Sequence, residues 1–548
     1  MKVDGDYVVY ECGCKYKILD HGPPMRIEWD IDYDNLNYEC EATWDFIGQG
    51  NTKGIFQLET RFGQQMAKKL KPNNLEQLSA LASILRPGPL ESRIDGKSLT
   101  EHYIDRKNGL DEVKYFHPSL EPILKDTYGV LIYQEESMAI AAQLAGFTMA
   151  ESNDLRKGLG KKSSVIIAAL KQQFIEGCEK IGKVNKEEAE EIFGWIEKGQ
   201  RYLFNASHGF SYAVNGYMSA YAKCHTAKSF STSYLFYAKE KPKKFDEIKL
   251  LVNDAKSMNI EIRPPSLSCL HEHFKRIEGK IVFGLMDIKE FGESAYKQAI
   301  KTIEEETKNL GKPIDQFTWP EFLILVAQNI KTPAVRGMIE CGVLDAFKVD
   351  RLRMLFEFEQ CCILSPKELK FVRENIRGTF AETLEFALQQ EKFCMKNRRG
   401  KLENIMGSLK RPPYSLADTP DWIAKVEEAR MGVSLTCSVV DGCKDADQAN
   451  ACCMDVKSGK CRHSGIFLAA QLKEVKSTTT KNGKNPGQEM AFVTFSDHSG
   501  ELDAVIFPDA WKDIFSSNVC FDGNLVLISG EVDKKKGSFV VKNMWQLS

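Results

Sequence analysis

The stretch Tyr202-Leu-Phe-Asn-Ala-Ser-His-Gly-Phe-Ser-Tyr212 joins a polar turn to the start of an aromatic helix. Three hydrogen-bonding side chains lie within that turn: Asn205, Ser207 and His208. Such groups can bind phosphate oxygens or the edge of a base. Tyr212, Tyr217 and Tyr221 offer rings that can stack on a base, which contributes ~1–3 kcal/mol per base. A tyrosine stripe at helical spacing can also be core packing, but the polar turn favours a functional interpretation.

A second cluster, Leu155-Arg-Lys-Gly-Leu-Gly-Lys-Lys162, is basic and contains two glycines. Its positive side chains are Arg156, Lys157, Lys161 and Lys162. The glycines let the backbone come close to a ligand while four cations converge on it, which suits a triphosphate. For this motif alone, the alternative is a helix end with a solvated basic face. A third cluster, Thr127-Tyr-Gly-Val-Leu-Ile-Tyr-Gln-Glu135, precedes both and strengthens the prediction of a shared site.

Length, charge and hydropathy limit the class of protein. A chain of 548 residues is too long for one core, so several domains are expected. The net charge of −2 means that any basic, nucleic-acid-binding surface must be local. No apolar run approaches the ~18 residues that cross a bilayer, and no signal-peptide core begins the chain. We therefore expect a cytoplasmic protein with no membrane partner, in which cysteines such as Cys178 and Cys341 are reduced core thiols.

The pattern along the chain predicts a mainly α, multidomain protein with a C-terminal all-β barrel. Residues 1–50 show weak periodicity, and the following stretch to about residue 236 is predominantly helical. Asn185 and Glu188 predict a capping box at the start of one helix. Near the C-terminus the period changes, and short apolar runs such as Leu525-Val-Leu-Ile528 are bounded by turn residues. Several such strands favour a small barrel of the oligonucleotide-binding (OB) type.

Six segments resemble, in the right order, the fingers of a bacterial-type (family C) replicative polymerase, the DNA polymerase III alpha subunit. They are Gly54-Ile-Phe-Gln-Leu-Glu59, Leu85-Arg-Pro-Gly-Pro89, Tyr128 to Glu135, Ala145-Gly-Phe147, Leu155 to Lys162 and Phe204 to His208. Gly284 to Ser294 resembles a helix-hairpin-helix, which grips duplex phosphates through backbone N–H groups. The C-terminal strands resemble the family's OB fold. The resemblance implies a DNA-directed DNA polymerase, a nucleotidyltransferase of DNA replication.

The resemblance also implies a domain organisation. Residues 1–50 would be a segment that follows the palm, 51–258 the fingers, 259–350 the helix-hairpin-helix duplex-binding domain, 351–436 a helical linker region, 437–463 a Cys-rich segment and 464–548 the OB-fold domain.

Residue roles and partners follow from the same resemblance. The incoming dNTP would contact Arg156, Lys157, Lys161, Lys162, Asn205, Ser207 and His208. Primer-template DNA would contact Lys289, Gly292, Tyr212 and Tyr217. A sliding clamp is an expected partner, although no clamp-binding peptide is recognisable between residues 350 and 430.

The chain departs from the family in two positions and in one missing part. Lys157 stands where an arginine is usual, and Ala206 where a lysine is usual, which removes one cation. The palm, with its three catalytic aspartates, should precede Gly54, but the residues there do not match it. The run Asp30-Ile-Asp32-Tyr-Asp34 would share one face of a strand, as metal ligands need, yet the resemblance places it in a surface connection.

These departures predict a chain without catalytic residues of its own. We expect the C-terminal part of a split polymerase of the kind that some bacteriophages use, acting in a bacterial cell or an infected host. A separate chain would carry the palm and hold most of the Mg²⁺. The alternative is a non-catalytic DNA-binding accessory protein of the replisome.

A cysteine cluster near the barrel is a candidate zinc site. Its proposed ligands are Cys437, Cys443, Cys452 and Cys461, with His463 nearby. The spacing is looser than the paired hooks of common zinc modules, so free cysteines remain equally compatible with it. Cys12 and Cys14 could add a second small site, but two ligands are too few to define one.

Overall fold

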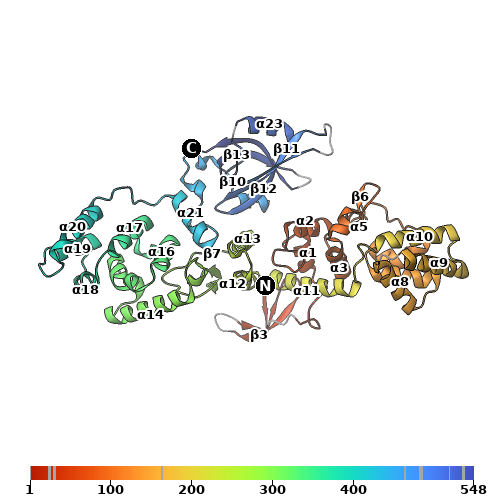
Figure 1. Ribbon diagram of the computed structural model, residues 1–548, viewed down its shortest axis with the longest axis horizontal. Coiled ribbons are helices and arrows are strands. Elements are labelled where there is room, and N and C mark those ends of the chain that lie inside the picture. Colours follow the sequence, from red (N-terminus) through yellow and green to blue (C-terminus); the bar gives the residue numbers. More distant parts are fainter. Residues whose placement is uncertain are drawn as a thin grey trace. The chain divides into compact units, whose positions relative to one another are not determined.

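The chain folds into two compact units, Met1–Ala227 and Lys228–Ser548 (Figure 1). The computed structural model describes residues 2–21, 26–28, 32–161, 164–461, 464–480, 486–517, 519–533 and 537–547. The prediction ends the fingers at residue 258, whereas the first unit ends at Ala227. Helix α13 (Lys244–Ser257) and nearly all of α12 (Ala227–Tyr237) thus belong to the second unit. Among the described helices, none has the length and apolar character that a membrane span requires.

The first unit begins with a small antiparallel sheet that the weak periodicity of residues 1–50 did not predict. Its strands are β1 (Lys2–Asp4), β2 (Tyr7–Val9), β3 (Lys15–Asp20) and β4 (Arg26–Ile27), in that order. Strands of two to six residues are too short for a clear period of two, which explains the weak signal. Asp32 and Asp34 are exposed and not in a strand, which agrees with the surface connection that the resemblance implies and not with a shared strand face. Asp30 lies outside the described residues.

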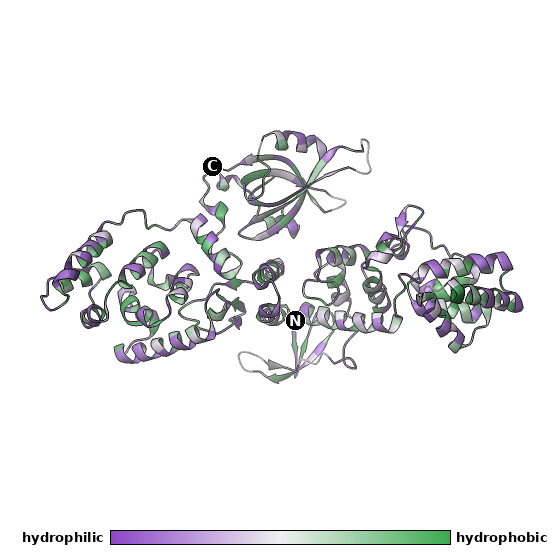
Figure 2. Ribbon diagram, in the orientation of Figure 1, coloured by the Kyte–Doolittle hydropathy of each residue, from purple (hydrophilic) through white to green (hydrophobic). Residues whose placement is uncertain are grey.

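Two hydrophobic cores organise the helices of the first unit. These helices are α1 (Glu41–Gly48), α2 (Arg61–Leu70), α3 (Leu75–Ile84), α4 (Pro87–Glu91), α5 (Leu99–Lys107), α6 (Glu121–Leu124), α7 (Gln134–Ala145), α8 (Met149–Lys161), α9 (Ser164–Ile181), α10 (Lys186–Gly199) and α11 (Ala206–His225). A short hairpin, β5 (Arg93–Ile94) and β6 (Lys97–Ser98), precedes α5. One core joins α1, α2, α3 and α5 with α11, and the other fills the bundle α7–α10. Figure 2 shows hydrophobic residues concentrated between the bundle helices.

Local sequence signals set several helix ends. The predicted capping box is confirmed: Asn185 Oδ1 accepts from the N–H of Glu188 at 2.9 Å, and Glu188 Oε2 accepts from that of Asn185 at 2.8 Å. Proline at the first position of α4 needs no N–H partner, so Pro87 starts a helix rather than only ending one. A Cβ on Gly88 would lie 2.6 Å from Tyr202 Cβ, so only glycine allows the chain before α11 to pack there.

The second unit begins with α12 and α13, a three-stranded sheet and a long helix. The strands are β7 (Ile262–Arg263), β8 (Lys275–Ile277) and β9 (Lys280–Val282), in the order β7-β9-β8, and the long helix is α14 (Glu293–Leu310). A 3₁₀ turn, Leu285–Asp287, precedes α14, whose N-cap is Gly292. A brief helix is thus followed by a longer one over the segment that resembles a helix-hairpin-helix. That the segment is a DNA-binding helix-hairpin-helix stays a prediction.

A buried ion pair joins two of the helices that follow, α17 (Arg351–Cys361) and α21 (Pro420–Met431). The others are α15 (Trp319–Glu321), continued by a π-helical turn over Phe322–Val326, then α16 (Thr332–Glu340), α18 (Pro366–Glu374), α19 (Phe380–Leu388), α20 (Lys396–Lys410) and α22 (Cys453–Lys457). Arg351 of α17 donates to Glu427 Oε1 of α21 at 2.8 Å and to Asp345 Oδ2 at 2.7 Å. Glu427 is wholly buried and also accepts from the backbone N–H groups of Leu435 and Thr436.

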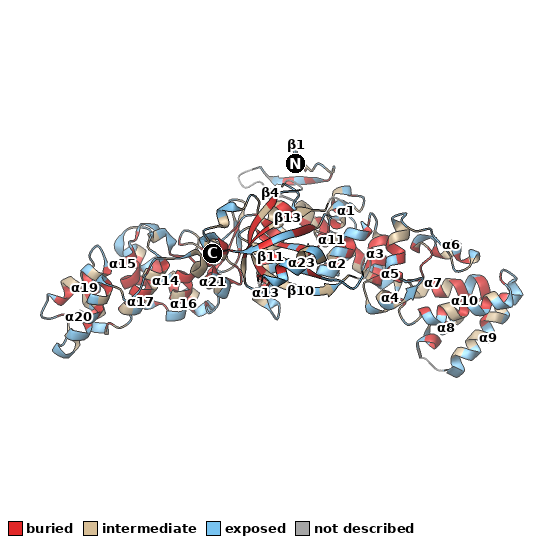
Figure 3. Ribbon diagram, turned by 90° about the horizontal axis from the view of Figure 1, so that it is seen from above, coloured by how far each residue is buried: buried red, intermediate tan, exposed pale blue. Residues whose placement is uncertain are grey.

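A closed five-stranded barrel ends the chain, which confirms the mainly helical class with a C-terminal barrel. Its strands are β10 (Ile466–Thr479), β11 (Glu489–Asp497), β12 (Gly500–Ile506), β13 (Leu525–Val532) and β14 (Phe539–Gln546), in the order β10-β11-β12-β14-β13. Among the described barrel strands, β12 and β14 are the one parallel pair, and α23 (Pro508–Ser516) connects β12 to β13. Figure 3 shows buried residues along the barrel strands.

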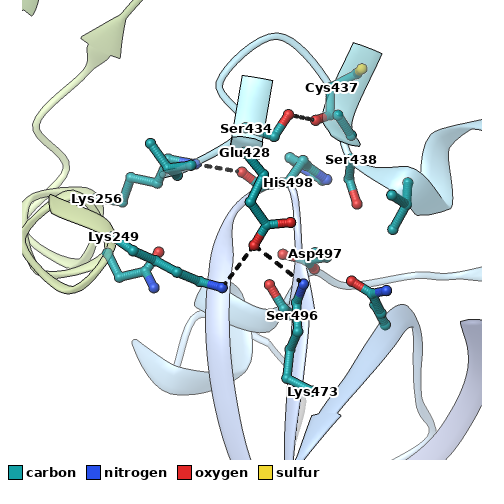
Figure 4. A pocket seen from close by; sticks show the side chains of 15 residues that line it. Lys249, Lys256, Glu428, Ser434, Cys437, Ser438, Lys473, Ser496, Asp497 and His498 are labelled. Carbon is teal, nitrogen blue, oxygen red and sulfur yellow. Dashed lines mark hydrogen bonds and ion pairs between the residues drawn. The ribbon is translucent and has the colours of Figure 1, made fainter. Parts of the chain in front are cut away.

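An ionic cluster attaches the barrel to the helices of its unit (Figure 4). Glu428 of α21 accepts from Lys249 of α13 at 3.0 Å and lies 3.7 Å from Lys473 of β10. Lys256 donates to the carbonyl of His498 at 2.9 Å. Burial alone would raise the pKa of Glu428, but the two lysines lower it below its ordinary value. The cavity that these groups line has a volume of about 60 Å³ and is too small for a substrate.

Candidate functional site

A backbone bridge brings two of the predicted clusters together in the first unit. Tyr133 and Phe204 form a parallel β-bridge, in which the N–H of Gln134 donates to the Phe204 carbonyl at 2.8 Å. The N–H of Phe204 donates to the Ile132 carbonyl at 2.9 Å. Since α7 begins at Gln134 and α11 at Ala206, the first turns of these helices lie side by side.

Asn205 is the N-cap of α11, and its amide is engaged within the protein. Its Oδ1 accepts from the N–H of His208 at 2.9 Å and from Ser207 Oγ at 2.7 Å. Its Nδ2 donates to Glu135 Oε1 at 2.8 Å, and Glu135 Oε2 accepts from the N–H of Ala206 at 2.9 Å. Asn205 is thus placed to position the turn, whereas the exposed side chains of Ser207 and His208 face solvent.

An aromatic row continues from this turn along one side of α11. The rings of His208 and Tyr212 are 4.1 Å apart, and Tyr212 meets Phe56 edge-on at 4.9 Å. At the start of the row, the guanidinium of Arg86 lies 4.1 Å from the centroid of Phe204. Burial lowers the pKa of Arg86. Arg86 belongs to the motif Leu85-Arg-Pro-Gly-Pro89, but the sequence did not predict its contact with Phe204.

Tyr217 does not belong to this row, and its predicted contact with DNA is wrong. The side chain is fully buried and packs 4.6 Å from Trp44, and its hydroxyl donates to the Asn37 carbonyl at 2.7 Å. No ring face is left for a base. Tyr221, which follows one turn later, is buried in the same core. Of the tyrosines on α11, Tyr212 is the one that keeps an accessible ring.

Arg156 is held beside the first turn of α7. Its Nε and Nη2 donate to Asn153 Oδ1 at 3.2 and 3.0 Å, and its Nη1 donates to Gln134 Oε1 at 3.3 Å. Lys157 is exposed on the next position of α8. Gln134, whose role the prediction missed, therefore connects the basic cluster with the turn that carries Asn205.

The glycines of the basic cluster have a different role from the predicted one. Gly158 lies inside α8, and a Cβ there would be 2.5 Å from Leu170 Cδ1 of α9, so this glycine permits close helix packing. Gly160 has open space around its Cα. The expectation that Gly158 lets a ligand approach the backbone is therefore wrong. The side chain of Lys161 and all of Lys162 lie outside the described residues, so their contribution stays a prediction.

A buried carboxyl shapes the turn before α7. Glu136 Oε2 accepts from the N–H groups of Ile132 and Tyr133, both at 2.8 Å, and Oε1 accepts from Thr127 Oγ1 at 2.9 Å. Burial raises the pKa of Glu136 to about 7, although these hydrogen bonds favour the ionised form. Burial also raises the pKa of Tyr133 to about 12. This network fixes the turn that presents Gln134 and Glu135.

The remaining predicted residues lie in the second unit. Lys289 is exposed, and its backbone N–H donates to the Arg430 carbonyl at 2.9 Å, while Gly292 is exposed at the N-terminus of α14. The Cys-rich residues do not come together. Cys437 donates to the Pro420 carbonyl and Cys452 to Asp455, while Cys443 and Cys461 pack against different hydrophobic clusters. His463 lies outside the described residues.

Comparisons with known proteins find similarity to bacterial DNA polymerase III alpha subunits, whose fingers the motifs of this chain resemble. Residues 22–182 match the family described as bacterial DNA polymerase III alpha subunit finger domain. The match includes Gln134, Glu135 and Arg156 but ends before α11.

Full-length relatives extend this similarity over most of the chain. The chain is 29% identical to DNA polymerase III subunit alpha of Bacillus subtilis (strain 168) over 514 residues. This alignment covers 93% of the chain and 42% of the relative. The chain is 30% identical over 512 residues, 92% of its length, to the subunit of Staphylococcus aureus (strain MRSA252), again covering 42%. For Thermus aquaticus the identity is 29% over 498 residues, 88% of this chain and 37% of the relative. The chain spans about two fifths of these relatives.

Proposed function

We propose that this chain binds incoming dNTP and primer-template DNA as part of a replicative DNA-directed DNA polymerase of the DNA polymerase III alpha type. The observation that carries the proposal is the junction of α7, α8 and α11. There Gln134 contacts Arg156, and Glu135 holds the N-terminal turn of α11. Arg156 and the exposed polar side chains of Ser207 and His208 thus lie around one turn. Since Glu135 already accepts from the N–H of Ala206, phosphate oxygens would be bound by the cation and the side chains rather than by the helix N-terminus.

In this proposal each described residue of the junction has one task. Arg156 and Lys157 neutralise phosphate oxygens, with Lys161 and Lys162 adding charge. His208 donates a hydrogen bond to the nucleotide, and Ser207 would turn its hydroxyl from Asn205 Oδ1 toward a phosphate oxygen. Asn205 keeps the turn in place by accepting from the N–H of His208. Tyr212 stacks on a base. These interactions orient the nucleotide and balance its charge, which is most of what a protein contributes to phosphoryl transfer.

We assign DNA binding to two parts of the second unit. The exposed N-terminus of α14, with Gly292 and Lys289, would bind duplex phosphates as a helix-hairpin-helix. The barrel would bind single-stranded template, and its strand order with a helix between the third and fourth strands supports an OB assignment. Both interactions would be insensitive to sequence and weakened by salt.

The metal-binding carboxylates of the reaction would come from a palm on a separate chain, as in the split arrangement predicted from the sequence. Within the described residues, the one group of three or more close metal-ligating side chains is made of cysteine and histidine, which do not suit Mg²⁺. No step of the reaction is therefore assigned to a metal in this chain. A sliding clamp is the further partner that we propose by similarity.

Arg156→Ala tests the proposal in primer extension with the palm-bearing chain present. Loss of the guanidinium should raise the KM for dNTP by about tenfold, which is about 1.4 kcal/mol, while the Kd for primer-template stays unchanged. Lys180→Ala, an exposed change on α9, is the charge-matched control and should alter neither value.

The same experiment distinguishes the polymerase proposal from the alternative of a non-catalytic DNA-binding accessory protein. A DNA-binding accessory protein has no use for a nucleotide pocket, so Arg156→Ala would then weaken duplex binding and extension to the same extent, or change neither. Extension by this chain alone would contradict the assignment of the carboxylates to a partner.

A further inference from the structure

Four potential metal ligands lie together at the C-terminal end of α11, away from the candidate nucleotide site. They are the thiols of Cys12, Cys14 and Cys40 and the imidazole of His225, and their ligand atoms all lie within 4.8 Å of one another. A helix of twenty residues is ~30 Å long, so this group and Asn205 mark opposite ends of the same element. The residues come from three separate places in the sequence, and Cys12 and His225 are 213 positions apart.

The spacing of the four atoms matches a tetrahedral zinc site. With Zn–S bonds of ~2.3 Å and Zn–N bonds of ~2.0–2.1 Å, tetrahedral ligand atoms lie ~3.5–3.8 Å from one another. His225 Nε2 lies 3.4 Å from Cys40 Sγ and 3.9 Å from Cys12 Sγ. Three thiolates and one imidazole complete the coordination without a water, which is the pattern of a structural rather than a catalytic zinc.

The local backbone presents each ligand for this purpose. Cys12 and Cys14 lie in the turn between β2 and β3, where the left-handed Gly13, at φ 85°, lets the chain reverse between the two sulfurs. The N–H of Gly13 donates to the Tyr10 carbonyl at 2.9 Å and closes the turn. Cys40 is the N-cap of α1 and makes no capping hydrogen bond, and the helix dipole there favours a thiolate. His225 is the last residue of α11.

Neighbouring donors reach the sulfur atoms, as outer partners do in metal sites. Asn37 Nδ2 donates to Cys14 Sγ at 3.5 Å, and Thr43 Oγ1 donates to Cys40 Sγ at 3.3 Å. Cys14 and Cys40 are buried, at 6% and 1% exposed. Buried thiolates need such donors and a cation, whereas inert core cysteines do not.

We propose that Cys12, Cys14, Cys40 and His225 bind one structural Zn²⁺, which fixes the N-terminal sheet to α1 and α11. Strands of two to six residues make a sheet of marginal stability, so a bond from its turn to two helices would contribute much of its order. The proposal is independent of the polymerase assignment, since zinc binding is measured without DNA or nucleotide.

The test is the metal content of the full chain, purified in reductant with Zn²⁺ supplied. We expect about one zinc per chain by inductively coupled plasma mass spectrometry. Cys14→Ser and His225→Ala should lower this content at least about tenfold, and His225→Cys should retain it because thiolate also binds zinc. The matched controls are Cys452→Ser and Cys461→Ser, which change thiols of the Cys-rich segment and should leave the content unchanged.

Cobalt(II) gives an independent readout of the coordination. The Co²⁺-loaded chain should show the intense visible bands of a tetrahedral site and thiolate-to-metal charge transfer, both lost in Cys14→Ser. Circular dichroism of each variant shows whether it has folded. Zinc-free protein with this segment folded, a disulfide among the three cysteines, or zinc retained in Cys14→Ser but lost in Cys452→Ser would each overturn the proposal.

Discussion

At the residue scale, two tyrosines of α11 that look alike in sequence have opposite environments. Tyr212 is part-exposed beside His208, and Tyr217 is buried with its hydroxyl on the Asn37 carbonyl. Tyr212→Ala should weaken binding of primer-template by ~1–3 kcal/mol, measured by fluorescence anisotropy, because a stacking surface is lost. Tyr212→Phe keeps the ring and should bind normally.

Tyr217→Phe is the matched change in the core. It should lower the free energy of unfolding by about 1 kcal/mol, because the buried side chain no longer donates to the Asn37 carbonyl, and leave DNA binding unchanged. Equal binding by Tyr212→Ala and the unchanged protein would remove Tyr212 from the proposed contact surface. Weaker binding by Tyr217→Phe at full stability would restore the role predicted from the sequence.

At the scale of elements, the turn before α7 depends on the protonation of Glu136. The carboxyl has an ordinary pKa of 4.5 when unfolded and a pKa of about 7 when folded. Between these values the folded state binds more protons, so stability falls as pH rises from about 4.5 through about 7. The difference amounts to about 3 kcal/mol at most. Glu136→Gln should remove this fall in urea unfolding measured at several pH values.

Ser137→Ala is the control for that experiment. It removes the hydrogen bond from Ser137 Oγ to the Gln134 carbonyl in the same turn, but no titrating group, so its effect should be equal at every pH. Parallel pH curves for Glu136→Gln and the unchanged protein would show that Glu136 titrates normally.

Helical periodicity could have separated the tyrosines, and other features had no local signal. Tyr217 lies five residues after Tyr212, which rotates it ~140° past one full turn of an α-helix. The two side chains therefore cannot share a face. The role of Gly158 depends on Leu170 of the next helix, and the group around His225 depends on tertiary packing across most of the first unit. Sequence motifs thus located the candidate site, but its connecting contacts, such as Glu135 to Asn205, needed the fold.

At the scale of the whole molecule, the chain divides into two compact units, and we expect each to unfold as a unit of its own. Glu427→Gln removes one partner of the buried Arg351 and should destabilise the second unit by ~3–5 kcal/mol. Glu428 follows Glu427 directly, but its side chain is 43% exposed. Glu428→Gln should therefore lower the free energy of unfolding by less than about 1 kcal/mol.

Hydrogen exchange read by mass spectrometry resolves the two units within one chain. Faster exchange in Glu427→Gln should be confined to peptides after residue 227. Gly177→Ala supplies the reciprocal change, because its Cβ would meet the Ala145 carbonyl oxygen at 2.1 Å and should loosen only α7 and α9 of the first unit. Faster exchange throughout the chain in either variant would show that the units unfold as one, because independent units open separately.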